Sequence, residues 1–240
     1  MELSQFSALS FDCYGTLIDW EAGIYHALQP LIARTGSALS RDKVLAGFAR
    51  HEARLEAELP TMPYSKLLSV LHDFLAREWG VEPDQAESRR FAASIGDWEP
   101  FPDTVPALRY LKRHFHLVIL SNVDRESFRA TNARLGVSFD EVCTAEDIGS
   151  YKPDPRNFAY LIAQVEAMGT PRDRLLHVAQ SLYHDHVPAQ AAGLASAWID
   201  RQHGATVPPT TEARYDFRFT SLEELADTHR KELHGTAARL

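Results

Sequence analysis

Ser10-Phe11-Asp12-Cys13-Tyr14-Gly15-Thr16-Leu17 is the stretch on which the interpretation of the whole chain depends. Residues 8–11 are short and mostly apolar, which favours a buried strand. Asp12 follows directly, and Gly15 lets the chain turn sharply soon after it. Open α/β sheets bind ligands at the carboxyl ends of their strands, so the Asp12 carboxylate lies where an active site is expected. We therefore predict that Asp12 is a covalent nucleophile; the alternative is that it only caps a turn, as Asp often does.

Strand and helix patterns alternate through most of the remaining chain. Short apolar runs predict four further strands, with amphipathic helices between them, and a late edge strand; the runs are 116–120, 141–145, 175–179, 195–199 and 215–220. This alternation implies a parallel sheet with right-handed crossovers. We expect residues 204–214 to form a loop before the edge strand.

Residues 18–98 contain only helical patterns. The predicted helices are 20–35, 42–58, 64–79 and 83–95, with turn residues at their borders. The predicted fold class is therefore α/β, with a Rossmann-like parallel-sheet core and an inserted all-helical cap domain. Residues 1–17 and 99–232 form the predicted core, and residues 18–98 form the predicted cap.

Composition excludes several classes of function. The chain of 240 residues carries a formal net charge of −8 and no basic stretch, which argues against nucleic acid as a partner. Its N-terminus lacks the cationic start and apolar run of a signal peptide, and no apolar segment approaches the roughly 20 residues of a membrane helix. Cys13 and Cys143 are the only cysteines, which favours a reducing, cytoplasmic setting. A small anionic substrate stays compatible with the acidic balance, because a few local cations can override the global charge.

Polar residues follow or end four of the predicted core strands. Parallel strands bring these ends to one edge of the sheet, where a site forms. The four stretches are Asp12–Thr16, Ser121-Asn122, Tyr151–Pro155 and Gln180–Asp185.

The residues of these stretches fit one type of reaction, attack by a carboxylate nucleophile on a small anionic substrate. A carboxylate nucleophile needs a nearby cation, and Lys152 can supply it. Hydroxyl and amide donors at Thr16, Ser121 and Asn122 can hold a substrate anion. A second acid, Asp185, can activate a water molecule. The alternative nucleophile Cys13 is disfavoured, because neighbours in a strand point to opposite faces.

The four stretches resemble the motifs of the haloacid dehalogenase superfamily, in the expected order. The helical insertion also follows the first motif, as it does in one large subgroup of that superfamily. Most members are phosphatases with Asp-x-Asp in the first motif and an acidic metal ligand in the fourth. Here those positions hold Tyr14 and Gln180, which are poor substitutes for a general acid and for a magnesium ligand.

The first motif instead resembles Asp-x-Tyr-Gly-Thr of the 2-haloacid dehalogenase (type II) branch. That resemblance implies a hydrolase acting on carbon–halide bonds, (S)-2-haloacid dehalogenase-like, without metal or cofactor. Asp12 would attack C2 of a short 2-haloalkanoate and displace halide with inversion, and water would then attack the Asp12 carbonyl to release the 2-hydroxy acid. Lys152 would balance the charge at Asp12, and Asp185 would orient the water. Ser121 would bind the substrate carboxylate, and Asn122 would help receive the halide.

The resemblance also assigns the other predicted site residues. Within the same motifs these are catalytic Thr16, substrate-binding Tyr14, and Gln180 and Ser181 as support for the water and the ester. An arginine of the cap would meet the halide; Arg50 is the first candidate, with Arg54 and Arg34 as alternatives. The chain departs from well-studied members at Gln180, at Leu182 and at Phe158, where a Tyr is usual.

Several alternatives stay open at this point. The chain could be a magnesium-dependent phosphatase of the same superfamily, or a non-catalytic member. His177, His184 and His186 suggest a metal site, with Asp185 between two of them, but no CxxC or HExxH pattern supports zinc. Tyr14, Trp20 and Trp98 either line a pocket between core and cap or simply pack there. Members of the family are often dimers, so a homodimer is also open.

Overall fold

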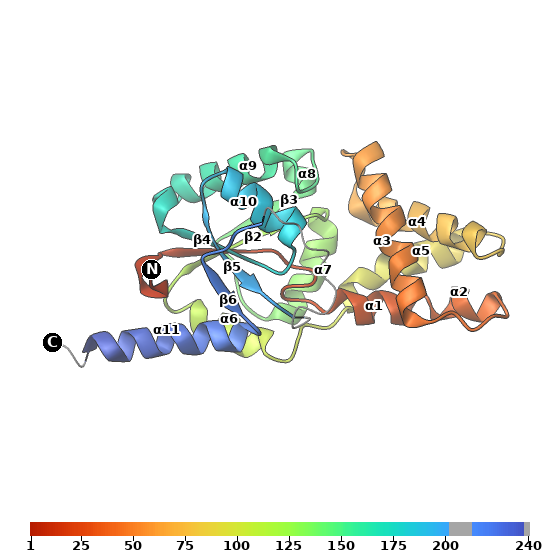
Figure 1. The fold of residues 1–240 in the computed structure, drawn as a ribbon. Coiled ribbons are helices and arrows are strands. Elements are labelled where there is room, and N and C mark those ends of the chain that lie inside the picture. The colour runs from red at the N-terminus through yellow and green to blue at the C-terminus, as the bar shows by residue number, and fades with distance from the viewer. Residues whose placement is uncertain (202–212, 238–240) are drawn as a thin grey trace.

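The computed structural model describes residues 1–201 and 213–237, and the predicted loop at 204–214 lies almost wholly outside them. A six-stranded parallel sheet in the order β3-β2-β1-β4-β5-β6 forms the centre (Figure 1). This arrangement confirms the predicted α/β fold class with a parallel-sheet core. The strands are β1 (Ala8–Phe11), β2 (His116–Ser121), β3 (Glu141–Thr144), β4 (Leu175–Ala179), β5 (Ala195–Ile199) and β6 (Phe217–Phe219).

Helices cover both faces of this sheet, which explains why its strands are apolar on both sides. Ala8, Val118 and Leu120 pack toward α9 and α10, whereas Leu9 and Phe11 face the cluster that contains residues of α6, α7 and α11. Figure 1 shows α9 and α10 on one side of the sheet and α6 and α11 on the other. The helical elements around the sheet are η1 (Leu3–Gln5), α6 (Thr104–Leu111), α7 (Arg125–Leu135), α8 (Ala145–Ile148), α9 (Pro155–Ala167), η3 (Arg172–Arg174), η4 (Leu182–His186), α10 (Val187–Ala191) and α11 (Leu222–Ala237).

The segment between β1 and α6 is helical and lies beyond the end of β1 (Figure 1). Its elements are α1 (Trp20–Ala27), α2 (Gln29–Arg34), α3 (Arg41–Glu58), α4 (Tyr64–Glu78), α5 (Gln85–Ala93) and η2 (Ser94–Asp97). Ser40 caps α3 by accepting a hydrogen bond from Lys43 N, as its position before the apolar pattern predicts. That residues 18–98 act as a separate cap domain stays a prediction.

The predicted single helix over 20–35 is wrong. Pro30, the second residue of α2, has no N–H to donate, and its ring conflicts with the carbonyl one turn earlier. The helix therefore ends at Ala27 and a new one begins at Gln29, whose side-chain amide donates to the carbonyl of Tyr25 over 2.9 Å.

The helical segment leaves and rejoins the sheet at one place. Asp19 N donates to Glu99 O over 2.9 Å, and Phe101 N donates to Leu17 O over 3.0 Å. The Thr104 hydroxyl donates to the same Leu17 carbonyl over 2.9 Å. The outgoing and returning chains thus lie side by side and are tied by hydrogen bonds.

Gly23 in α1 packs against Trp98 close to this junction, and we expect Gly23→Ala to destabilise the fold. A β-carbon at this position would lie 2.4 Å from Cγ of the buried Trp98. Overpacking of this kind costs about 1–3 kcal/mol, which urea unfolding would measure. The control is Gly235→Ala in α11, because no atom of the described residues lies within 4 Å of a β-carbon built there. The control variant should be neutral or stabilised by up to about 1 kcal/mol, and equal effects of the two changes would contradict the packing argument.

Candidate active site

The polar strand ends meet at one cavity of about 480 Å³. Asp12 follows β1, Ser121 ends β2, and Gln180 follows β4. Lys152 comes from the segment between α8 and α9, and Asp185 lies in η4. The predicted site residues that line the cavity are Asp12, Tyr14, Ser121, Asn122, Lys152, Gln180, Ser181 and Asp185.

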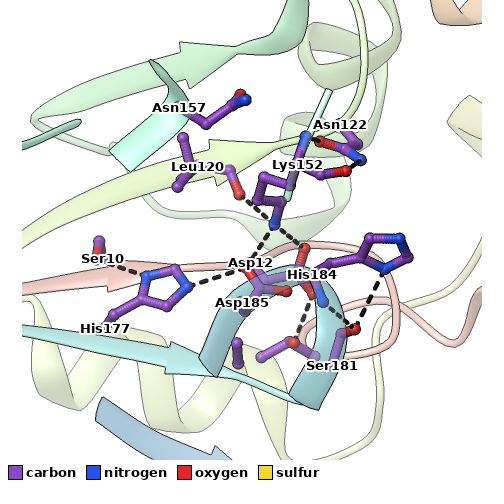
Figure 2. A network of polar contacts seen from close by, with 12 residues as sticks. Ser10, Asp12, Leu120, Asn122, Lys152, Asn157, His177, Ser181, His184 and Asp185 are labelled. Carbon is purple, nitrogen blue, oxygen red and sulfur yellow. Dashed lines mark hydrogen bonds and ion pairs between the residues drawn. The ribbon is translucent and has the colours of Figure 1, made fainter. Parts of the chain in front are cut away.

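The ammonium group of Lys152 lies at the centre of the site (Figure 2). Its Nζ donates to Asp12 Oδ1 over 2.9 Å, to Asp185 Oδ1 over 2.7 Å and to the carbonyl of Leu120 over 3.1 Å. A lysine ammonium has three N–H groups, so all three are used. Lys152 is 3 % exposed, and this ion-paired arrangement therefore holds the two carboxylates at fixed positions away from bulk water.

Burial and neighbouring opposite charges shift the pKa values of these groups in opposite directions. Burial raises the pKa of Asp12, while Lys152 and the Thr16 hydroxyl oppose that rise. Burial would also raise the pKa of Asp185, but Lys152 and a hydrogen bond with His177 outweigh it and hold that pKa below its usual value. The pKa of Lys152 is raised, because the two carboxylates outweigh the desolvation of its ammonium. The site therefore holds a charged lysine between two acids, with Asp185 the more firmly ionised.

A buried series of hydrogen bonds through His177 and Ser10 holds Asp185 in place. His177 Nε2 lies 3.0 Å from Asp185 Oδ1, and His177 Nδ1 lies 2.9 Å from the Ser10 hydroxyl (Figure 2). Ser10 and His177 are register partners on the neighbouring strands β1 and β4. The ring of Phe158 packs edge-on against His177 at 5.1 Å between centroids. This series orients one oxygen of Asp185 and leaves Oδ2 without a partner among the described residues.

Thr16 lies outside the cavity lining but holds Asp12 directly. Its hydroxyl donates to Asp12 Oδ2 over 2.7 Å and accepts from Gln180 N over 2.9 Å. The Thr16 carbonyl in turn accepts from the Arg201 guanidinium. The loop after β1 is thus fastened to the loop after β4, which sets the orientation of the Asp12 carboxylate.

Asn122 and Ser181 have clear local structural contacts. Asn122 Oδ1 accepts from Lys152 N over 2.6 Å, and its Nδ2 donates to Lys152 O over 3.2 Å, so Asn122 fixes the backbone that carries the lysine. The Ser181 hydroxyl accepts from His184 N over 3.1 Å and caps η4. The hydroxyl of Ser121 is buried and has no partner among the described residues.

Arg50 does not reach the cavity. The face of α3 that lines it consists of Ala49, Glu52, Ala53 and Glu56. At about 100° per residue, Arg50 and Arg54 point roughly 110° and 150° away from the centre of that face. Arg50 instead contacts Glu78 over 2.7 Å, and both guanidinium-bearing side chains are more than half exposed. The remaining alternative, Arg34, pairs with Glu87. The predicted placement of a cap arginine over the site is therefore corrected.

Aromatic residues form much of the remaining cavity wall. Tyr14, Trp20, Tyr64 and Trp98 all line it. Tyr14 meets Trp98 edge-on at 5.7 Å, and its hydroxyl lies 2.8 Å from Thr131 Oγ1. The two interpretations of these aromatics are thus compatible, since the rings pack together and also face the cavity.

Sequence reasoning missed three contributors to this site. His177 was considered only as a metal ligand, although its pairing with Ser10 across two predicted strands was a usable signal. Glu52 and Glu56 carry no such signal, because acidic residues on a charged helix normally face solvent.

The described residues contain no group of three or more His, Cys, Asp or Glu arranged to hold a metal ion. His186 Nε2 donates to Ala179 O over 3.0 Å, its Nδ1 lies 2.9 Å from Ser196 Oγ, and burial lowers its pKa to about 4. His184 is held by Ser181. The three histidines near Asp185 therefore have separate protein partners. In the described part of the chain, no helix is long and apolar enough to cross a membrane.

The chain is similar to a known protein family and to several known proteins. A family model described as haloacid dehalogenase-like hydrolase matches residues 6–193. An (S)-2-haloacid dehalogenase of Pseudomonas putida is 26% identical over 218 residues, covering 85% of this chain and 88% of the relative. The crystal structure of a defluorinating L-2-haloacid dehalogenase superposes with a TM-score of 0.76 at 26% identity, covering 94% of this chain and 95% of that one. A pyrimidine 5'-nucleotidase of Escherichia coli is 27% identical over 131 residues, covering 53% of this chain and 57% of the relative.

Proposed function

Because the chain belongs to the haloacid dehalogenase-like hydrolase family, we propose that it removes halide from short 2-haloalkanoic acids through an ester on Asp12. The observation that carries this proposal is the Lys152 ammonium held between Asp12 and Asp185 at the cavity wall. Tyr14 stands where a phosphatase of this family would need a second acid. The enzymes named as relatives over nearly the whole chain act on (S)-2-haloacids, which supports the same reaction.

The first step is a substitution at carbon. A carboxylate oxygen of Asp12 attacks C2 of the substrate, and the carbon–halogen bond breaks with its electron pair leaving on the halide. Lys152 and Thr16 hold the two Asp12 oxygens, which fixes the direction of attack. Ser121 is the proposed contact for the substrate carboxylate, because its buried hydroxyl has no partner among the described residues. Asn122 and Tyr14 line the cavity and are proposed to contact the rest of the substrate and the halide.

The second step is ester hydrolysis. Water attacks the carbonyl carbon of Asp12, and the bond from that carbon to the substrate oxygen breaks. Asp185 takes a proton from the water through its unpartnered Oδ2 and returns it to the departing alkoxide of the 2-hydroxy acid. The second proton of the water is released to solvent as the Asp12 carboxylate re-forms. Gln180 and Ser181 line this part of the cavity and are proposed to support the water and the ester.

A magnesium-dependent phosphatase is the second candidate, favoured by the likeness to a nucleotidase over half of the chain. Magnesium is bound mainly by charged oxygen ligands. Here both Asp12 and Asp185 are paired with Lys152, and the neighbouring positions hold Tyr14 and Gln180. We rank this reaction second on that donor chemistry.

A cytoplasmic location belongs to the proposal as well. Cys13 and Cys143 are both free and buried, which suits a reducing compartment. A homodimer is proposed only by likeness to the family.

The test is halide release from 2-chloropropanoate in EDTA, combined with a single turnover in heavy-oxygen water. We expect chloride release in EDTA and one heavy oxygen in the peptide that contains Asp12, because water attacks the Asp12 carbonyl. Magnesium-dependent phosphate release from p-nitrophenyl phosphate without chloride release would favour the phosphatase. Ligand binding without either product would indicate a non-catalytic member.

A further inference from the structure

Two acidic residues of α3 line the cavity that also contains the reaction centre. Glu52 and Glu56 are one helical turn apart and both line the cavity, together with Ala49 and Ala53. Both side chains are half-buried. The small alanines leave room beside them, so the two carboxyl groups are the main polar groups that α3 presents to a bound substrate.

The cavity has no free cation to balance these acids. Among the described residues no arginine lines it, and Lys152 is the single lysine that does. The three N–H groups of Lys152 already serve Asp12, Asp185 and the Leu120 carbonyl. Burial lowers the pKa of the cavity-lining His184, which keeps that ring neutral. A substrate with only negative charge would therefore find no positive partner on the α3 side among the described residues.

The surroundings of Glu52 and Glu56 leave part of each carboxyl group for a ligand. Tyr64 donates its hydroxyl to Glu52 Oε1, and Asn122 Nδ2 donates to Glu56 Oε1 over 3.3 Å. Burial raises the pKa of Glu52 to about 7 and that of Glu56 well above its usual value, with Glu52 adding to the effect on Glu56. An ammonium group placed beside the two carboxyls would favour their ionised forms, because a nearby opposite charge lowers the pKa of an acid.

A second observation marks the opposite end of the ligand. The Ser121 hydroxyl lines the same cavity, is 1 % exposed as a residue, and has no partner among the described residues. Ser121 offers a donor to an anion, whereas Glu52 and Glu56 offer acceptors to a donor or cation. The cavity thus offers both a donor for an anionic group and acceptors for a donor or a cation.

We propose that Glu52 and Glu56 select substrates that carry an ammonium group at the end remote from the carbon attacked by Asp12. The preferred class is a 2-haloalkanoate with a terminal amine, whose carboxylate lies at Ser121 and whose ammonium lies at Glu52 and Glu56. This inference rests on the proposed function for the reaction, but the charge preference of the cavity is a separate property.

The kinetic test compares 4-amino-2-chlorobutanoate with 2-chlorobutanoate, which differ only in the amine. We expect kcat/KM for the amine to exceed that for 2-chlorobutanoate by at least about 10-fold, the lower range for a hydrogen bond between charged groups. In the double variant Glu52→Gln/Glu56→Gln the ratio should fall to about 1, because glutamine keeps the shape and loses the charge. The matched control is Glu58→Gln on the same helix, whose exposed side chain pairs with Arg54 and should leave the ratio unchanged.

A binding measurement separates failure of this inference from failure of the proposed function. Calorimetry with 4-aminobutanoate and butanoate, neither of which carries a halogen, should show the same preference for the amine and its loss in the double variant. If calorimetry shows the preference but neither chlorinated compound releases chloride, the proposed reaction is wrong and the charge preference stands. Equal binding of the two probes by the unmodified protein, or an unchanged ratio in the double variant, would overturn the inference.

Discussion

Asp12→Asn is expected to abolish chloride release from 2-haloalkanoates, with a loss of kcat on the order of 10⁴-fold or more, as for other removed nucleophiles. The amide is uncharged and a weak nucleophile, so the bond from Asp12 to C2 cannot form at a useful rate. The fold should persist, because an asparagine oxygen still accepts from Lys152 and the Thr16 hydroxyl can accept from the amide.

The measurement is initial-rate chloride release, with the urea unfolding midpoint as the check on folding. Asp154→Asn is the matched control, since Asp154 lies two residues from Lys152, caps α9 and does not line the cavity. Asparagine is as good a cap as aspartate, so this control should keep its activity. A folded Asp12→Asn variant with near-normal turnover would eliminate the ester mechanism.

Lys152→Met is expected to cause the second large effect, on stability as well as on activity. Removal of one partner from a buried ion pair typically costs about 3–5 kcal/mol, because the remaining charges lose their compensation. Here Asp12 and Asp185 would both remain, buried and close to each other. Turnover should be lost with the lysine, since nothing else among the described residues holds both carboxylates.

The stability loss of Lys152→Met should depend on pH in a specific direction. Without the ammonium the pKa of at least one of the two carboxyls rises above its value in the unfolded chain, because burial and the other carboxyl then act alone. A carboxyl whose folded pKa is raised stabilises the fold below the unfolded pKa and loses that contribution as the pH rises through the folded pKa. The deficit relative to the unmodified protein should therefore be small near pH 4 and grow toward pH 8.

Urea unfolding at pH 4.5, 6 and 8 would measure this deficit. Lys112→Met is the control, because Lys112 forms a partly exposed ion pair with Asp140 over 2.6 Å. Such pairs contribute about 0–1 kcal/mol, so the control should change little with the same change in pH. A Lys152→Met deficit that stays flat with pH would contradict the assignment of the two acids to one coupled site.

The family and the core of the site could be predicted from the sequence because several key residues lie at the end of a strand or directly after it. The strands β1, β2 and β4 set the positions of Asp12, Ser121 and Gln180. A parallel sheet brings the carboxyl ends of its strands to one edge, so these residues are expected to lie close together. The family predicted from these motifs is confirmed by the family model. The parallel sheet follows from the alternation of strands and helices, and the helical segment between β1 and α6 follows from the lack of strand patterns there.

The α3 side of the site could not be predicted in the same way. Which face of α3 meets the core depends on packing with α1 and α4, and a shift of one residue turns the helix by about 100°. Arg50 and Glu52 are two residues apart, so the sequence alone could not decide between a basic and an acidic wall. Glu52 and Glu56 also resemble solvated charges, because nothing local distinguishes them from Glu58.

The adjacent outgoing and returning chains at Leu17–Asp19 and Glu99–Phe101 have a consequence for how such proteins diversify. Since Asp19 N and Glu99 O are 2.9 Å apart, the helices between them form an excursion whose ends already meet. A segment of this kind can be exchanged for another of different length or composition without moving β1, which Asp12 follows, or the segment between α8 and α9 that carries Lys152. The nucleophile and the α3 side of the cavity can therefore change independently in evolution. Recombination at this junction is a direct route to an enzyme with a different substrate preference.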